Sequence, residues 1–141
     1  DRRAAITLGL LIGSALLALS GATHLHLWAM GYRTIPTIGP LFILQGIAGV
    51  LLAVLLLLWR RLLVVVAGVG FMVATIGGLL VSVSFGLFGF RDTFAAPYAG
   101  LSLVLESAGA VVLAVVGIVL VRGHRRSDQG NPPVEPVRSA A

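Results

Sequence analysis

Four long apolar runs, separated by short polar segments, constrain the fold of this chain more than any other feature. The runs cover about residues 4–30, 38–58, 62–88 and 94–121. Each is at least as long as the roughly 20 residues that a helix needs to cross the hydrocarbon core of a bilayer. Because backbone polar groups in hydrocarbon must be hydrogen-bonded within their own segment, each run is expected to be a transmembrane helix.

The composition also favours lipid as the solvent. Of the 141 residues, 58% are hydrophobic and only 11% are charged, whereas a soluble domain carries about 25% charged residues. The absence of Cys and Lys excludes disulfides, thiolate metal sites, a Cys nucleophile and Schiff-base chemistry. The net charge is +5, but the arginines sit at the ends of the apolar runs. That pattern indicates membrane topology and no nucleic-acid partner.

The arginines are divided unequally between the two sides of the predicted membrane domain. Arg33 and Arg91 lie on one side, and the other arginines lie on the opposite side, namely Arg2, Arg3, Arg60, Arg61, Arg122, Arg125, Arg126 and Arg138. Basic residues are enriched in cytoplasmic segments, so both termini are expected in the cytoplasm. The Ala-, Val-, Leu- and Gly-rich composition without Lys suggests a bacterial protein, and we expect it in the inner (plasma) membrane.

Residues of two kinds are expected to anchor the helices at the membrane surface. Aromatic side chains settle at the headgroups, and arginines beside them remain in water. The predicted anchors are Trp59, Arg60 and Arg61 on the cytoplasmic side, and Tyr32 and Arg33 on the outer side. We expect residues 1–126 to form the transmembrane domain. Residues 127–141, which are polar and proline-rich, are expected to be a disordered cytoplasmic tail.

The two halves of the chain resemble each other. Gly31-Tyr32-Arg33 follows the first run and Gly89-Phe90-Arg91 follows the third. The segment that begins at Gln45 aligns with the one that begins at Glu106, small residue on small residue and aliphatic on aliphatic. We therefore predict an all-α, four-helix transmembrane bundle built from a duplicated two-helix hairpin. Its halves should be related by a pseudo-twofold axis along the membrane normal.

Small residues mark surfaces where helices are expected to meet. Gly9 and Gly13 share one face of the first run, four residues apart. A second stripe recurs every four residues along the third run: Gly70, Ala74, Gly78 and Ser82. Because small side chains permit close approach, the second stripe is predicted to face another helix, whereas the pair Gly9 and Gly13 either permits such an approach or is incidental to the composition.

One polar cluster is expected within the outer half of the bundle. Glu106 is the only acidic residue deep inside a run, and a charged side chain there costs about 2.5–3.5 kcal/mol on insertion scales. It should therefore face the bundle, as a proton-handling or ligand-anchoring acid or as a hydrogen-bonding link between helices. The predicted pocket residues are Glu106, Gln45, His24, Ser82 and Trp28, the last sharing a helix face with His24.

His24 and His26 are the only candidates for a metal or haem site, and their spacing argues against one. Residues two apart on a helix point about 200° apart, whereas two His that share a metal on one helix are normally four apart. We predict no metal. The sequence also has no Ser-His-Asp arrangement, phosphate-binding loop or paired carboxylates within a run, so an enzyme is not expected.

Several of these features resemble the DoxX-like group of small four-helix membrane proteins. They are the four short spans, the polar end of the first span, the Gln45-x-x-x-Gly49 segment in the second, and the Arg60-Arg61 pair between spans two and three. The resemblance covers about residues 13–121. It implies a role near quinone oxidation and redox homeostasis.

The sequence leaves three functions open. The first is a non-enzymatic accessory subunit or scaffold of a larger membrane assembly, respiratory or redox-linked, with other membrane subunits or further copies of itself as partners. The second is a module that binds a quinone-like or other small amphipathic ligand. The third is an oligomeric proton or small-solute transporter. No cofactor is predicted, although quinone and lipid are compatible ligands.

The arginine distribution predicts the outcome of a topology experiment. Reporters fused at Ala141 and after Arg61 should read as cytoplasmic, and a reporter in the segment 31–34 should read as external. Alkaline phosphatase and fluorescent protein fusions would measure this. An external reading at Ala141 would contradict the predicted orientation.

Overall fold

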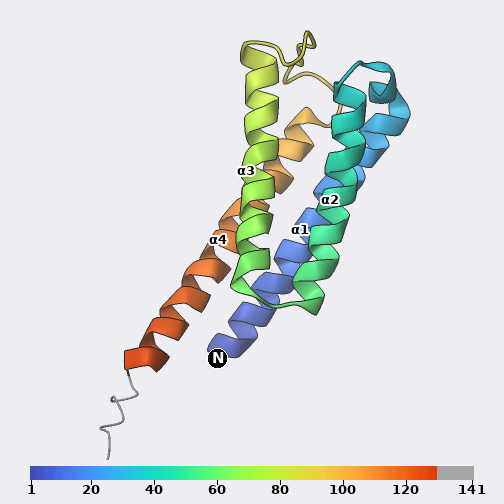
Figure 1. The fold of residues 1–141 in the computed structure, drawn as a ribbon. Coiled ribbons are helices and arrows are strands. Elements are labelled where there is room, and N and C mark those ends of the chain that lie inside the picture. Colours follow the sequence, from blue (N-terminus) through green and yellow to red (C-terminus); the bar gives the residue numbers. More distant parts are fainter. Residues whose placement is uncertain (130–141) are drawn as a thin grey trace, which may run out of the picture.

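The computed structural model describes residues 1–129 and is built from helices (Figure 1). The elements are α1 (Arg2–Met30), the short 3-10 helix η1 (Tyr32–Thr34), α2 (Ile38–Leu58), α3 (Leu62–Ser84) and α4 (Ala99–Gln129). In this part of the chain, four helices are long and apolar enough to cross a membrane. This confirms the all-α, four-helix prediction. Residues 127–129 of the predicted tail belong to α4, and the rest of it lies outside the described residues.

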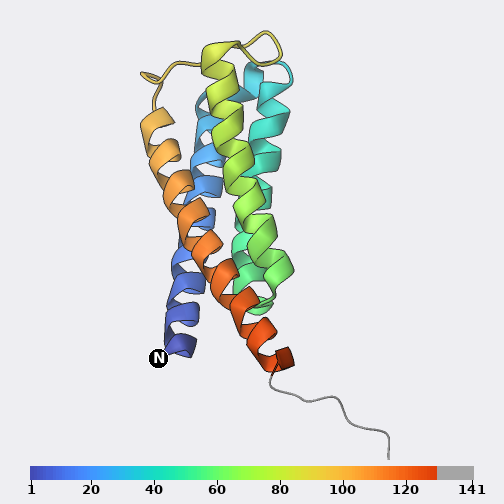
Figure 2. The ribbon, with the colours of Figure 1, turned by 90° about the vertical axis from the view of Figure 1, so that its left-hand side faces the viewer.

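The helices run alternately up and down as a bundle (Figures 1 and 2). The start of α1, the link between α2 and α3, and the last turns of α4 lie at one end. We call this the Arg-rich end, because it carries Arg2, Arg3, Arg60, Arg61, Arg122 and Arg125. The opposite, loop end is formed by residues 31–37 and 85–98.

The closest helix contact joins α1 to α2 through glycines. A Cβ added to Gly21 would lie 2.7 Å from the Gly46 carbonyl oxygen, and one added to Gly49 would lie 3.0 Å from the Gly21 Cα. The Ser14 hydroxyl donates to the Ala53 carbonyl oxygen at 2.8 Å across the same interface. Such close approach lets backbone atoms contribute to van der Waals packing, which drives helix association in lipid.

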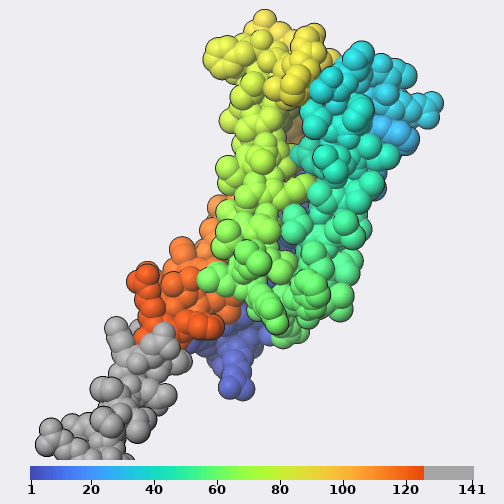
Figure 3. All heavy atoms as spheres, viewed as in Figure 1, coloured from blue at the N-terminus to red at the C-terminus, as the bar shows by residue number. Residues whose placement is uncertain are grey.

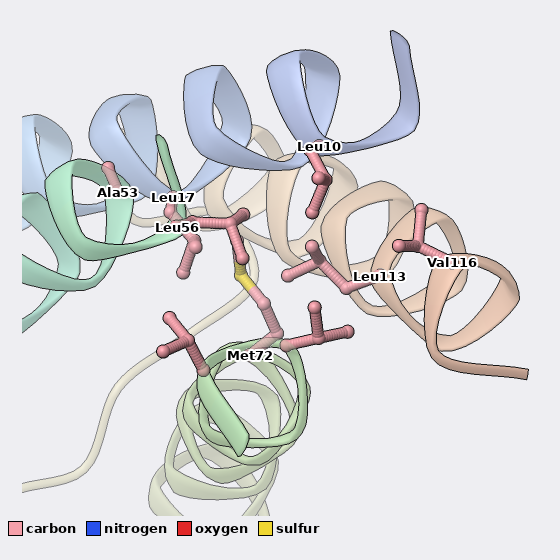
Figure 4. Packing of buried hydrophobic residues seen from close by; sticks show 9 residues of the cluster. Leu10, Leu17, Ala53, Leu56, Met72, Leu113 and Val116 are labelled. Carbon is pink, nitrogen blue, oxygen red and sulfur yellow. The ribbon is translucent and has the colours of Figure 1, made fainter. Parts of the chain in front are cut away.

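The second face of α1 packs on α4 through the predicted pair Gly9 and Gly13. A Cβ added to Gly9 would overlap the Val116 side chain, and one added to Gly13 would overlap Leu113. This first stripe therefore faces another helix. The neighbouring core is apolar (Figure 4), with its centre formed by Leu10, Leu17, Ala53, Leu56, Val64, Val65, Met72, Leu113 and Val116.

The second stripe of small residues, on α3, does not pack as predicted. Nothing lies within 4 Å of a Cβ added to Gly70 or Gly78, and Ala74, Gly78 and Ser82 line a cavity. The expectation that this stripe faces another helix directly was wrong. Small residues allow close approach, but they leave space when the neighbouring helices are held apart by other contacts.

The helix ends at the loop end also differ from the expected spans. α3 ends at Ser84, before Phe88, where Gly86 adopts a positive φ, and Arg91 donates to the freed Val83 and Ser84 carbonyl oxygens at 3.2 and 3.0 Å. A tight turn follows, in which Phe88 and Gly89 both have positive φ. α4 begins only at Ala99, because Tyr98 has a positive φ that is incompatible with a right-handed helix.

The two predicted repeats, α1–α2 and α3–α4, each form a packed antiparallel pair. The contact between the pairs is uneven, because α1 packs extensively on α4 whereas α2 packs only sparsely on α3. The duplicated origin of the hairpins stays a prediction.

The contact at Gly21 predicts a stability difference between two glycine variants. Gly21→Ala should lower the free energy of unfolding by about 1–3 kcal/mol, because backbone atoms of α2 must move to admit the methyl group. Gly77→Ala is the matched control, since nothing lies within 4 Å of its added Cβ. Thermal unfolding in mild detergent measures both. Equal melting temperatures for the two variants would contradict the predicted glycine contact.

Candidate functional site

A cavity of about 110 Å³ lies in the half of the bundle nearest the loop end. All four long helices contribute to its wall, and Figure 3 shows the surface hollowed between α2 and α3. Its polar lining residues are His24, Tyr32, Gln45, Thr75, Ser82, Asp92, Ser102 and Glu106. A volume of this size can hold several water molecules or one small ring.

Glu106 is the fully buried polar group of this cavity. It lies on α4, seven residues after Ala99, and its side chain is 0% exposed. Its Oε1 accepts a hydrogen bond from the Ser20 hydroxyl at 3.2 Å. Its Oε2 has no hydrogen-bond partner among residues 1–125, whose side chains the structure describes. Since leaving a buried polar atom unpaired is costly, Oε2 is the atom that a ligand or water would satisfy.

The partner of Glu106 was not among those expected from the sequence. Gln45, Ser82 and His24 were the candidates, yet the bond comes from Ser20 on α1. Ser20 lies four residues before His24 and therefore shares its helix face. The spacing of four residues could have identified Ser20 from the sequence, since a polar residue on the same inward helix face as His24 also lies close to the bundle centre.

His24 is buried, and one of its ring nitrogens is committed to the backbone. Its Nδ1 lies 2.9 Å from the Ser20 carbonyl oxygen. Because a carbonyl only accepts, Nδ1 must carry a proton and donate it, which leaves Nε2 as an acceptor in the neutral ring. The imidazole also packs edge-on against Phe42, with ring centroids 5.2 Å apart. His24 is therefore fixed in orientation and in tautomer.

Gln45 and Ser82 lie on the same cavity from α2 and α3. The Ser82 hydroxyl oxygen accepts a hydrogen bond from the Asp92 backbone N–H at 3.2 Å. This bond holds the loop of residues 85–98 against the edge of the cavity. Gln45 is half-buried and forms no side-chain hydrogen bond within the described chain. In the alignment of the two sequence halves, His24 corresponds to Ser82 and Gln45 to Glu106. All four residues line the same cavity.

An aromatic cluster covers the cavity at the loop end. Tyr32 stacks on Phe42 with ring centroids 4.7 Å apart, and Phe90 meets Tyr32 edge-on at 5.8 Å. Burial, with a smaller contribution from the Asp92 carboxylate, raises the pKa of the Tyr32 phenol above its usual value. The phenol therefore stays protonated at neutral pH. Phe42 and Phe90 were not singled out as site residues, because their ring contacts depend on how the loops fold back.

Other predicted site residues lie away from this cavity. Trp28 is half-buried and does not line it. His26 is exposed and packs edge-on against Tyr98, with centroids 5.2 Å apart. His24 and His26 thus have separate surroundings, and the described side chains, up to residue 125, contain no group of three or more His, Cys, Asp or Glu that could hold a metal.

The predicted surface anchors occupy the two ends of the bundle. Trp59, Arg60 and Arg61 are exposed at the link between α2 and α3. Arg33 is exposed at the loop end, whereas Tyr32 is only half-exposed because it also covers the cavity.

Comparisons with models of protein families, with curated proteins and with solved structures find no match for this chain. The chemistry of the cavity is therefore the guide to function. Its lining combines the buried acid Glu106, the imidazole of His24 and the amide of Gln45 with an aromatic wall. No Arg lines it within the described residues. This arrangement suits a flat molecule with hydrogen-bond donors more than an anion.

The Ser20–Glu106 bond predicts a coupled effect on stability. Ser20→Ala should lower the free energy of unfolding by about 1–3 kcal/mol, because both carboxyl oxygens then lack a partner. In a Glu106→Leu background, the same change should cost much less, since no acid remains to be satisfied. Thermal unfolding of the four proteins measures the coupling. An equal cost in both backgrounds would show that Ser20 stabilises the bundle independently of Glu106.

Proposed function

We propose that this protein is an integral membrane protein that binds a small amphipathic ring bearing hydroxyl groups, a quinol, in the cavity at the loop end. The Arg-rich end lies in the cytoplasm of a bacterial cell, and the cavity lies in the outer half of the inner membrane. The observation that carries the proposal is the unpaired Oε2 of Glu106, which is buried on a cavity of about 110 Å³.

The hydrogen-bonding groups favour a donor ligand. When Glu106 is ionised its Oε2 only accepts, and His24 Nε2 accepts in the neutral ring. A quinol hydroxyl can donate to either atom, whereas the oxidised quinone has only acceptors. Hydrogen bonds to charged groups contribute about 1.5–3 kcal/mol each, so the carboxylate distinguishes the two oxidation states.

The apolar part of the cavity favours an aromatic ring. Phe42, Tyr32 and Phe90 lie at its loop end, and aliphatic side chains, among them Leu27 and Leu79, complete the wall. Aromatic rings gain about 0.5–1.5 kcal/mol from edge or offset contacts beyond the area that they bury. The wall therefore accommodates the ring while the polar groups orient its hydroxyls.

Access from the lipid is supported by the α2–α3 side of the bundle. This pair of neighbouring helices packs sparsely, and Ala74 and Gly78 leave open space on the α3 side. A quinol dissolves in the bilayer, so a lateral opening suits it better than an opening to water.

Two other functions stay predictions. An accessory or scaffold role in a larger membrane assembly is compatible with ligand binding, and the resemblance to DoxX-like proteins implies a redox setting for both. Transport is less favoured, because Leu17, Leu56, Met72 and Leu113 are fully buried between the cavity and the Arg-rich end. They leave no polar path there within the described chain.

The proposal predicts a preference for the reduced ligand. At an alkaline pH, where Glu106 is ionised, tetramethylhydroquinone should bind at least about tenfold more tightly than tetramethylbenzoquinone, the difference of one charge-assisted hydrogen bond. Glu106→Gln should fold normally and lose most of this preference, because its amide NH₂ can donate to a quinone oxygen. Glu106→Asp should retain part of it. Anaerobic isothermal titration calorimetry measures the affinities. Equal binding of both forms by the unmodified protein would refute the proposal.

A pair of neighbouring glycines tests the location of the ligand. Gly78→Leu should abolish binding of tetramethylhydroquinone by filling the cavity, whereas Gly77→Leu should leave it unchanged. The control is matched, because nothing lies within 4 Å of a Cβ added at either position and only Gly78 lines the cavity. The same titrations measure the effect. Undiminished affinity in Gly78→Leu would place the ligand elsewhere.

A further inference from the structure

A second concave site lies between α3 and α4, at the Arg-rich end. It is a groove of about 590 Å³ whose walls are aliphatic or glycine over most of its length. Its lining residues are Leu62, Val65, Val66, Val69, Gly70, Leu113, Ala114, Gly117, Ile118, Val121, Arg122 and Arg125. None of these residues takes part in the cavity around Glu106.

We propose that this groove binds an anionic phospholipid of the leaflet at the Arg-rich end, with an acyl chain in the apolar part and the headgroup phosphate on Arg122 and Arg125. The two arginines are three residues apart on α4 and lie on one side of the helix. Both are exposed and both line the groove. No acidic side chain lines it within the described residues.

The order of the groups along the groove matches the order in a lipid. From Leu113 to Val121 the α4 wall is apolar, and eight residues of helix extend about 12 Å. This is close to one leaflet of a hydrocarbon core that is about 30 Å thick. Arg122 and Arg125 follow directly, at the level where headgroups begin. The groove thus has a hydrocarbon section of leaflet depth and a cationic section beyond it.

Small residues create the depth of the groove. Nothing lies within 4 Å of a Cβ added to Gly70, and one added to Gly117 would only make ordinary contact with Val65 at 3.5 Å. A larger side chain at Gly70 would therefore occupy space that is open to an acyl chain. The charge of the arginines and the open space at Gly70 are independent features, and each can be changed separately.

The arginine test uses native mass spectrometry of the full chain from nanodiscs that contain phosphatidylglycerol and phosphatidylcholine. The protein should retain phosphatidylglycerol preferentially. The double variant Arg122→Gln/Arg125→Gln should reduce that retention about 30-fold, because each basic residue near an anionic surface contributes about fivefold. The matched control is Arg60→Gln/Arg61→Gln, which removes the same charge at the same end but outside the groove. An equal loss in both double variants would show unspecific charge attraction and overturn the proposal.

The acyl-chain test fills the groove without altering charge. Gly70→Leu should also reduce retention of phosphatidylglycerol by about tenfold or more, whereas Gly77→Leu should not, although both positions have open space around an added Cβ. Full retention in Gly70→Leu would mean that only the headgroup is bound at the surface. A dimer that disappears in Gly70→Leu, without bound lipid in the unmodified protein, would assign the groove to a second copy. Either result would overturn the proposal.

Discussion

The close contact of α1 with its neighbours determines most of the structure. At Gly21 the backbones of α1 and α2 approach as closely as a missing Cβ allows, and at Gly9 and Gly13 the side chains of α4 fill the space in the same way. α1 thereby becomes the central helix of the bundle. α3 packs chiefly on α4 and only sparsely on α2, so space remains between them. The cavity is a consequence of this unequal packing.

The buried acid gives that space its chemistry. A charge inside a bundle is tolerated when hydrogen bonds satisfy it, and Glu106 obtains only one of them from the described chain. A group that served only to link helices would be expected to have both oxygens paired, because a partly satisfied polar group stabilises less than an apolar one. The incomplete pairing, together with the fixed tautomer of His24, favours a site that is completed by a ligand.

The length and hydropathy of the runs were sufficient to predict the four helices, because both are set locally by each segment. The free-energy cost of a carboxylate in lipid was sufficient to predict that the Glu106 side chain faces the interior of the bundle. Its partner Ser20 and the rings of Phe42 and Phe90 depend on how the helices cross and how the loops return, which no local pattern encodes. The stripe at Ala74 and Gly78 could not be interpreted from the sequence for the same reason. Small residues are compatible with close helix contact or with open space, and only the positions of the neighbouring helices decide between the two.

The bond between Ser20 and Glu106 has a consequence for biogenesis. Ser20 lies on α1 and Glu106 on α4, so Ser20 is synthesised earlier and the acid reaches the membrane when its partner is already there. A lone α4 would carry the insertion cost of about 2.5–3.5 kcal/mol for a charged side chain, and the assembled α1–α2 hairpin lowers it by offering a hydroxyl. Insertion of α4 is thereby coupled to its packing against α1, because the described part of α1 supplies the hydroxyl that Glu106 binds.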